Sequence, residues 1–580
     1  MVAATDPVVA ATGPWSPRLA PWSATGPVVP STAARDYGAV KVDALYEGRF
    51  ATLDPAHPIA RRLAVSASRI VALDEETDGL EAPLRHDFGR EATVVPGFHD
   101  AHCHTTGFGL RLGELDLSSP PVESLEHLYE LVGSSAAGLP AGMFVVGSGY
   151  DQNKIGGRHP ERRRLDEVAG GRPVLLKHTS GHMCVVSSAV FAMTGGAERR
   201  PIEGGLVRLD ENGEPTGLLE ERAQALVQAL VLPRSLEELA GAIRLAHERY
   251  VTEGLTSVTD AGVAGGWIGE SPLELAAYQL ARERGWLGVR SIVMISADVL
   301  GPVNGHPDDG VELALDAGIR TGLGDEWLRI GPLKIFSDGS LIGRTCWMED
   351  DFADEAGNSG YPQSDPDDLR RLLVAAHTAG WQLATHAIGD RAIRFVLDCY
   401  GEALAQVPRG DHRHRVEHCG VANDEQADRL AALGVIPVPQ GRFVSEIGDG
   451  MLAALGPERS AIAYRMGGFR RKGIVVPGSS DRPVVDGRPL LGIRDLVVRR
   501  TAAGVPLGQE EAVTADEALR AWTVGSAYAA RCEAERGTLS VGKLADFAVL
   551  EADPREVEAG DIGDIAVLAT VVGGEVSFSA

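Results

Sequence analysis

Hydrophobic and polar positions alternate in short runs near both ends of the chain. Such runs occur at residues 40–46 and 62–73, and again at residues 545–550 and 567–576. Because successive side chains of a β-strand point to opposite faces of its sheet, each run predicts a half-buried strand. We therefore predict one small β-sandwich domain formed by both chain ends, from residues 39–95 plus 536–580.

The middle of the chain alternates between helical and strand-like patterns. A hydroxyl residue followed three positions later by Glu predicts the start of a helix at Ser235, Ser271 and Thr514. Short apolar runs typical of buried strands stand at residues 255–259, 330–336, 382–385, 414–418, 435–439 and 474–477. The repetition predicts an α/β fold with a parallel sheet, and its length favours a (β/α)8 TIM barrel over residues 96–535. A doubly wound sheet is the competing fold, but the Gly-rich phosphate turn that usually accompanies it does not occur in the sequence.

Two segments depart from this alternation. Residues 1–38 are rich in Ala, Pro, Ser, Thr and Val without a sustained period, which predicts a flexible N-terminal arm. Residues about 181–230 contain an Asn212-Gly213 hairpin signal instead of a simple helix. Added chain on the loop side of a barrel usually covers the active site, so we interpret this insertion as facing the substrate.

Charge and cysteine content narrow the classes of function. The chain has 580 residues, with 55 Lys and Arg against 81 Asp and Glu, a formal net charge of −26. A surface this acidic disfavours nucleic acid and anionic membranes as partners. The net charge does not identify the substrate, which we expect to be a small molecule. No apolar run reaches the roughly 20 residues that span a bilayer, and the first residues lack the pattern of a signal peptide. The six cysteines form no disulfide framework or Cys-x-x-Cys zinc pattern, so we expect a reduced, cytoplasmic enzyme.

Polar side chains recur where the predicted strands end. His102 and His104 alternate along one strand and would share a face, where two imidazoles can hold a divalent metal ion. Four later residues take the same position at other predicted strand ends: Lys334, His386, His418 and Asp481. Any one of them alone could be a core histidine, a snorkelling lysine or a helix-capping aspartate. Because functional residues of a barrel gather at the carboxyl ends of its strands, the whole set predicts a metal site.

Five short motifs contain these residues, and a sixth stands near the C-terminal end of the chain. They are Pro-Gly-Phe-x-Asp-x-His-x-His at 96–104, Lys-Ile-Phe-x-Asp-Gly-Ser-Leu at 334–341, His-Ala-Ile-Gly-Asp-Arg-Ala at 386–392, Arg-x-Glu-His at 415–418, Ser-Asp-x-Pro-Val at 480–484 and Gly-Lys-Leu-Ala-Asp-Phe-Ala-Val-Leu at 542–550. The order of these motifs and the residues within them resemble those of the amidohydrolase superfamily, and within it the YtcJ-like group that includes N-substituted formamide deformylases. The resemblance spans about Val40 to Phe578.

The resemblance implies a centre of two divalent metal ions, with zinc favoured and iron, manganese or cobalt as alternatives. The implied ligands are His102, His104, Lys334, His386, His418 and Asp481. Asp481 would complete the ion held by the first two histidines, while His386 and His418 would bind the second ion. Lys334 would bridge the ions as an N6-carboxylated lysine, because an ammonium group cannot ligate a metal. A metal-bridging hydroxide would attack the substrate, and Asp481 would act as the general base that passes a proton to the leaving nitrogen.

Further residues are expected to contact the substrate or support the ligands. Asp100 shares the strand face of the two histidines and could orient one of them. Asp151 and Gln152 follow the strand-like run 145–150, and His182 follows the run 174–178, so all three are expected at the substrate. Arg344 is a candidate substrate anchor, with a structural salt bridge as the alternative role.

The predicted reaction is hydrolysis of a carbon–nitrogen bond other than a peptide bond. The expected substrate is an N-substituted formamide, another N-acyl amine or a carbamate. A cyclic amide, imide or lactone hydrolase would use the same metals with a differently shaped pocket. A catalytically silent binding or regulatory homologue is a further alternative, although loss of ligands would usually mark it and all six are present here. Whether one or two ions bind, and whether the protein forms a homodimer, stays open.

Overall fold

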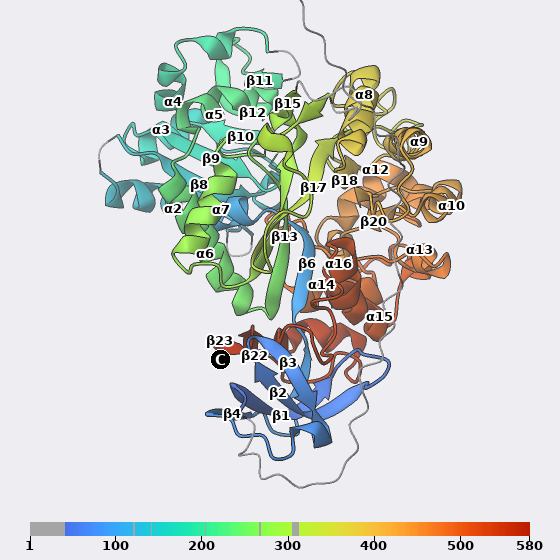
Figure 1. Cartoon of the computed structure of the whole chain (residues 1–580). Helices are drawn as coiled ribbons and strands as arrows, with labels where there is room; N and C mark the ends of the chain where they lie inside the picture. Colours follow the sequence, from blue (N-terminus) through green and yellow to red (C-terminus); the bar gives the residue numbers. More distant parts are fainter. Residues whose placement is uncertain are drawn as a thin grey trace, which may run out of the picture. The chain divides into compact units, whose positions relative to one another are not determined.

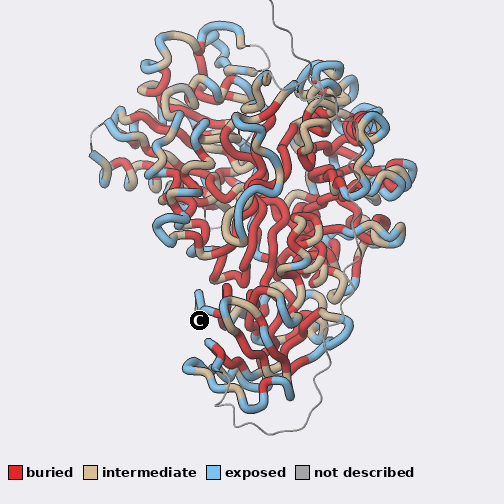
Figure 2. The backbone as a smooth tube through the Cα atoms, in the orientation of Figure 1, coloured by how far each residue is buried: buried red, intermediate tan, exposed pale blue. Residues whose placement is uncertain are grey.

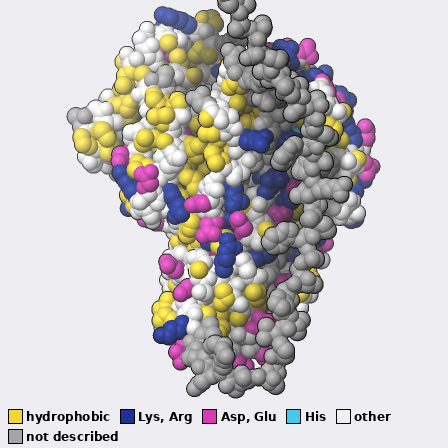
Figure 3. Space-filling model, in the orientation of Figure 1, with side chains coloured by type: hydrophobic (Ala, Val, Ile, Leu, Met, Phe, Trp, Pro, Cys, Tyr) yellow, Lys and Arg dark blue, Asp and Glu magenta, His cyan; other side chains and the backbone are white. Residues whose placement is uncertain are grey.

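A computed structural model describes residues 41–119, 122–140, 142–181, 183–202, 205–265, 268–303 and 312–580 of the chain. The predicted N-terminal arm, residues 1–38, lies outside these described residues. Lys41–Ala580 form one compact unit that contains three larger sheets (Figure 1). On the face seen in Figure 3, acidic and basic side chains are interspersed rather than gathered by sign. Among the described residues, no helix is long and apolar enough to cross a membrane.

The first sheet joins the two ends of this unit. Its eight strands run in the order β23-β22-β21-β5-β1-β2-β3, with β4 beside β1. Their bounds are β1 Ala44–Ala51, β2 Ile59–Ser66, β3 Arg69–Leu73, β4 Leu84–Asp87, β5 Thr93–Pro96, β21 Phe547–Leu550, β22 Val567–Val572 and β23 Glu575–Ser579. The two chain ends meet where β5 pairs antiparallel with β21. Both ends therefore share one sheet, as predicted, but a division of that sheet into the two layers of a sandwich is not confirmed.

The alternating run at residues 62–73 is a hairpin. β2 ends at Ser66, β3 begins at Arg69, and the two strands pair antiparallel. Ala67 and Ser68 have φ angles of 48° and 65°, the left-handed pair found in two-residue hairpin turns. The Asp43 carboxylate accepts a hydrogen bond of 2.7 Å from the N–H of Ala67, which holds the turn in place. Because neither turn residue is the usual Asn or Gly, the sequence pattern did not reveal the reversal.

The second sheet is parallel and barrel-like. Its strands run in the order β20-β19-β18-β17-β14-β13-β6, and every neighbouring pair is parallel. Their bounds are β6 Phe98–Cys103, β13 Leu255–Val263, β14 Arg290–Ser296, β17 Leu328–Phe336, β18 Leu383–Ala387, β19 Arg415–His418 and β20 Ile436–Val438. Figure 2 shows this central sheet buried among the surrounding elements. Five of the six apolar runs that predicted strands are confirmed.

The sixth run, residues 474–477, is not a strand, yet the chain beside it connects the two edges of the sheet. The N–H of Ala101 in β6 donates to the carbonyl of Gly478 at 3.0 Å. The hydroxyl of Ser479 donates to the carbonyl of Pro439, just after β20, at 3.0 Å. This segment therefore lies between the first and the last strand. The α/β class and the parallel, barrel-like sheet are confirmed.

Helices connect and flank the parallel strands. Apart from four helices that accompany the third sheet, they are α1 Thr105–Leu112, α6 Leu236–Val251, α7 Glu274–Glu283, α8 Pro366–Thr378, α9 Asp390–Gln406, α10 Asp424–Leu433, α11 Gly441–Glu446, α12 Gly448–Ser460, α13 Gly467–Arg471, α14 Pro489–Val498, α15 Ala515–Arg520 and α16 Ser526–Ala529. The predicted capping boxes at Ser235 and Thr514 are confirmed. The one at Ser271 is wrong, because the Glu274 carboxylate instead accepts the N–H groups of Ala264 and Glu270 at 3.1 Å each.

The third sheet lies between β6 and β13 in the sequence. Its six strands run β11-β12-β10-β9-β8-β7, with bounds β7 Leu115–Asp116, β8 Val145–Tyr150, β9 Val174–His178, β10 Met183–Val186, β11 Gly205–Leu209 and β12 Pro215–Glu221. Helices α2 Leu125–Gly138, α3 Arg162–Val168, α4 Ser188–Met193 and α5 Ala225–Val231 accompany it. The predicted hairpin around Gly213 is confirmed as β11–β12. This sheet begins at Leu115, well before the predicted insertion at about 181–230, because strand–helix alternation does not show which sheet a strand joins.

Candidate metal centre

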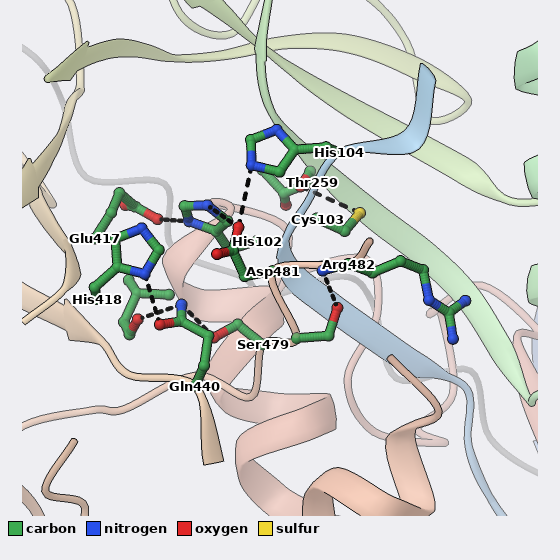
Figure 4. A network of polar contacts seen from close by, with 12 residues as sticks. His102, Cys103, His104, Thr259, Glu417, His418, Gln440, Ser479, Asp481 and Arg482 are labelled. Carbon is green, nitrogen blue, oxygen red and sulfur yellow. Dashed lines mark hydrogen bonds and ion pairs between the residues drawn. The ribbon is translucent and has the colours of Figure 1, made fainter. Parts of the chain in front are cut away.

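The carboxyl ends of the barrel strands bring three predicted ligands together. One possible ligand atom from each of His102, His418 and Asp481 lies within 4.8 Å of the other two, and all three residues are buried. His102 belongs to β6 and His418 to β19, while Asp481 follows the segment that joins the edges of the sheet. Figure 4 shows their side chains converging on one point. This cluster is the candidate metal site of the described residues.

The proton on the His102 ring is placed by Glu417. Nδ1 of His102 lies 2.5 Å from Oε2 of Glu417, whose carboxylate also accepts from Arg415 Nε at 2.7 Å and Nη2 at 2.8 Å. Burial raises the pKa of Glu417, but Arg415 and His102 outweigh it and hold the pKa far below its usual range. Glu417 is therefore an acceptor, Nδ1 carries the proton, and Nε2 carries the lone pair.

Nε2 of His102 faces a second acceptor. It lies 3.2 Å from Oδ1 of Asp481, and no hydrogen-bond donor reaches it within the described part of the chain. Burial raises the pKa of Asp481, but the neighbouring imidazoles of His102 and His104 lower it well below the usual value, so the carboxylate is ionised. A lone pair and a carboxylate oxygen in a buried site fit a cation between them. The residues present therefore fit a metal ion.

His104 contacts the same oxygen of Asp481. Its Nε2 lies 3.1 Å from Oδ1, and its ring centroid is 5.5 Å from that of His102. His104 stands at the N-cap of α1, so it leaves β6 at the position where the chain turns into the helix. The structure thus joins His104 to the cluster through Asp481.

A chain of hydrogen bonds orients His418. The Gln440 amide nitrogen donates to the carbonyl of Val438 at 2.9 Å and to the hydroxyl of Ser479 at 3.2 Å. The amide oxygen of Gln440 is therefore the atom 2.8 Å from Nδ1 of His418, and Nδ1 must donate. Burial lowers the pKa of His418 to about 3. The ring is neutral and offers Nε2 as a ligand.

His386 and Lys334 lie on the neighbouring strands β18 and β17. The His386 ring centroid is 4.5 Å from that of His418, and its Nε2 donates to the carbonyl of Gly339 at 3.0 Å. Nδ1 of His386 is then the nitrogen that can accept. Burial lowers the pKa of Lys334 to about 8, which raises the fraction of neutral amine near pH 7. Both residues line one cavity with His418 and Asp481.

Asp100 supports the centre through the backbone. Its carboxylate accepts from the main-chain N–H of His102 at 3.1 Å, and from the N–H and hydroxyl of Ser480 at 3.0 and 2.5 Å. We expected Asp100 to orient a histidine ring, but Glu417 takes that contact on His102. Asp100 instead ties the end of β6 to the loop that carries Asp481.

Sequence reasoning missed Glu417 and Gln440 as orienting residues. Glu417 stood inside the Arg-x-Glu-His motif, so the motif was a signal that could have identified it. Gln440 follows β20 at its carboxyl end, which is also where support for a barrel site is expected.

The cluster opens into a cavity of about 710 Å³. Barrel residues such as His104 and Lys334 form its inner wall, and Lys177 and Ser180 from the third sheet and its loop line it as well. The third sheet thus lines the cavity, and the substrate-facing role of the predicted insertion stays a prediction. His182, a predicted substrate residue, lies outside the described residues.

The other three predicted substrate residues are Asp151, Gln152 and Arg344. None of them is among the described residues that line the cavity. Asp151 accepts the N–H of Asn153 at 2.9 Å, and the Gln152 amide oxygen lies 2.6 Å from Nε2 of His178. Arg344 pairs with Asp354 at 2.5 Å, the structural role that the sequence left open. The structure does not bring these side chains to the cluster.

Known proteins resemble this chain along most of its length. The family model described as "Amidohydrolase family" matches residues 90–578. "Putative amidohydrolase YtcJ" of Bacillus subtilis (strain 168) is 30% identical over 495 residues, covering 84% of this chain and 89% of that protein. "N-substituted formamide deformylase" of Arthrobacter pascens is 30% identical over 539 residues, covering 91% of this chain and 96% of that protein. The crystal structure of an uncharacterized metal-dependent hydrolase from Pyrococcus horikoshii OT3 has a similar fold, with a TM-score of 0.70 and 23% identity over 89% of this chain and 99% of that one.

Proposed function

Because this chain belongs to the amidohydrolase family, we propose that it is a metal-dependent hydrolase of a carbon–nitrogen bond outside peptides. The observation that carries the proposal is the pair of facing acceptors, Nε2 of His102 and Oδ1 of Asp481, 3.2 Å apart. An N-substituted formamide is the favoured substrate, since one relative of 30% identity is a deformylase of such compounds. Other N-acyl amines and carbamates share the same scissile bond.

The metal centre that we propose uses all six predicted ligands. They are His102, His104, Lys334, His386, His418 and Asp481. When bound, two divalent ions, with zinc favoured, supply a Lewis acid that polarises the substrate carbonyl and acidifies water. Lys334 would contribute as a carbamate, formed when its neutral amine attacks carbon dioxide and releases one proton. Its lowered pKa of about 8 supports this role because the attack requires the neutral amine.

Asp481 is the proposed general base. Its pKa lies well below the usual value, so the carboxylate is available to accept a proton from water and to pass it to the leaving nitrogen. Glu417 and Gln440 hold the rings of His102 and His418 in fixed tautomers while this occurs. The cavity wall from the third sheet would reduce the access of bulk water to the reacting groups.

Family membership also leads us to propose the finer architecture. The segment around 474–478 would take the eighth position of a (β/α)8 barrel, and the sheet made by both chain ends would close into a sandwich. The hydrogen bonds of Ala101 and Ser479 to the flanking strands support the first point.

Metal analysis followed by a substrate screen tests the proposed function. The purified full chain is loaded with zinc, its metal content is measured, and hydrolysis of formamides, acyl amines, carbamates, cyclic amides and lactones is compared. We expect about two ions per chain and the highest turnover on an open-chain amide. Highest turnover on a cyclic amide or a lactone would favour those hydrolases. Less than about one ion per chain together with no hydrolysis would favour a silent homologue.

A further inference from the structure

Arg111 in α1 is a cationic side chain of the cavity wall without a carboxylate partner. Its Nη1 donates to the carbonyl of Pro483 at 2.6 Å. Within the described part of the chain, no carboxylate oxygen lies within 4.0 Å of its guanidinium. Burial lowers its pKa from the ordinary value, and the charges of Asp116 and Glu114 do not offset that effect. Cationic groups removed from water are normally paired, so this one points to an anion that is not part of the chain.

Two acidic side chains act electrostatically on Arg111, and both are engaged elsewhere. The Asp116 carboxylate accepts from the N–H of Ser118 at 3.0 Å and from its hydroxyl. Glu114 pairs with Lys177 at 2.6 Å and also accepts from the hydroxyl of Ser148. Glu114, Lys177 and Arg111 all line the cavity. Neither carboxylate forms an ion pair with Arg111 among the described residues, so the guanidinium has no direct counter-ion on this part of the wall.

The backbone of β8 leaves room for the Arg111 guanidinium. Nη2 of Arg111 lies over Gly149, so close that a Cβ at this position would collide with it. Gly149 also has a φ angle of 91°, where side chains are strained. A residue other than glycine would therefore displace the guanidinium from this place.

Arg111 also lies on the side of α1 that faces the candidate metal centre. It follows His104 by seven residues, two helical turns or roughly 10 Å along the axis, and both residues line the cavity. Long helical side chains lean back toward the N-terminus, which brings the guanidinium closer to His104 than its Cα is. The Pro483 carbonyl that it contacts lies only two residues after Asp481.

We propose that Arg111 is the specificity-determining residue of an anion subsite, and that the preferred substrate is an N-acyl amine carrying a carboxylate a few bonds from the scissile C–N bond. The inference rests on the proposed function for the bond that is cut. A guanidinium matches a carboxylate through two parallel hydrogen bonds, so both oxygens of the substrate carboxylate would be bound.

The test compares two formamides that differ in one group. N-formylleucine and N-(3-methylbutyl)formamide share the formamide and the side chain, and only the first carries the carboxylate. Zinc-loaded full chain should hydrolyse N-formylleucine with a kcat/KM at least about tenfold higher, the size expected of a charged hydrogen bond. Arg111→Met should remove that preference, mainly through KM, and leave the neutral formamide within about twofold. Arg111→Lys should retain part of the preference, because it keeps the charge and loses the fork.

Arg163→Met is the matched control, since Arg163 is an exposed residue of α3 and is not among the described residues that line the cavity. An equal or higher kcat/KM for the neutral formamide in the wild type, or an unchanged ratio in Arg111→Met, would overturn the subsite while leaving the hydrolase proposal intact. If neither formamide is hydrolysed, calorimetric titration of the zinc-loaded protein with N-formylleucine decides. If the wild type binds N-formylleucine and Arg111→Met does not, the subsite is supported even without hydrolysis. If the wild type does not bind N-formylleucine, the subsite is overturned.

Discussion

Replacing Glu417 with Gln separates two contributions of one buried carboxylate. Glu417 accepts two hydrogen bonds from Arg415, at 2.7 and 2.8 Å, and one from His102. Both Glu417 and Arg415 have fully buried side chains. A Gln side chain of the same shape has only one acceptor oxygen and no charge. The variant therefore leaves the Arg415 guanidinium without its counter-charge and weakens the control of the His102 tautomer.

The burial of the Arg415–Glu417 pair and the contact of Glu417 with His102 determine the expected size of both effects. Breaking a fully buried ion pair by removing one partner costs about 3–5 kcal/mol of folding free energy. Losing the orienting partner of a ligand histidine reduces metal affinity by about 10- to 100-fold, or about 1.4–2.7 kcal/mol. The first effect acts on the metal-free protein, whereas the second appears only when metal is bound.

Urea unfolding of the metal-free protein and zinc competition with a chelator measure the two effects separately. Glu402→Gln is the control, because its pair with Arg370 at 2.9 Å is exposed and its loss should cost at most about 1 kcal/mol. The double variant Arg415→Met, Glu417→Leu removes both buried charges, so it should be more stable than Glu417→Gln while its zinc affinity stays low. Stability within about 1 kcal/mol of the wild type and unchanged zinc affinity in Glu417→Gln would refute this account of the cluster.

Three further variants test other parts of the chain. Lys334→Ala should lose metal and activity together, and normal zinc content with normal turnover would contradict the bridging role. Asp481→Asn should keep much of its metal but lose most of its rate, whereas near-wild-type turnover would exclude it as the base. Burial lowers the pKa of His247 to about 3 in the folded protein, so between about pH 3 and 6.5 the unfolded state binds a proton that the folded state does not. The free energy of unfolding should therefore fall as pH drops below about 6.5, by up to about 1.4 kcal/mol per pH unit for this group, and His247→Asn should show a smaller slope in urea unfolding at pH 5.0–6.5. An unchanged slope would show that His247 does not carry this linkage.

Much of the site follows from the sequence because parallel strands share a direction. Once the middle of the chain is assigned to a parallel sheet, the residues that end each strand must meet at one edge. His102 and His418 were identified on that basis, and the structure brings them together with Asp481. The alternation of strands and helices carries no such information about sheet membership. We expected Asp151 and Gln152 at the cavity because we assigned the strand before them to the barrel. That strand, β8, belongs with β9 to a separate sheet, and neither residue is among the described residues that line the cavity.

Strand alternation also fails where the backbone leaves the strand. On β19, Arg415 and Glu417 share one face, and both contact β6, through Ala101 and His102. His418 directly follows Glu417 and would point to the opposite face if the strand continued. Its φ angle of 67° turns the chain instead, so the two rings of His418 and His102 lie 4.9 Å apart. No sequence pattern marks this turn, because a positive φ angle can be predicted with any strength only at glycine.

Asp481 reaches the cluster through the same left-handed backbone conformation, with a φ angle of 61°. A residue other than glycine in this left-handed region costs on the order of 1–3 kcal/mol, so neighbouring contacts must hold it there. The N–H of Asp481 donates to the carbonyl of His102 at 2.7 Å, and Asp100 binds the adjacent Ser480 through its N–H and hydroxyl. Asp100 therefore acts on the conformation of the Asp481 loop, and the ligand geometry depends on a residue that touches neither ligand side chain in the structure. The residues that could bind a metal can be predicted from their positions at successive strand ends. The residues that hold those ligands in place can be identified only once the backbone conformation at each ligand is known.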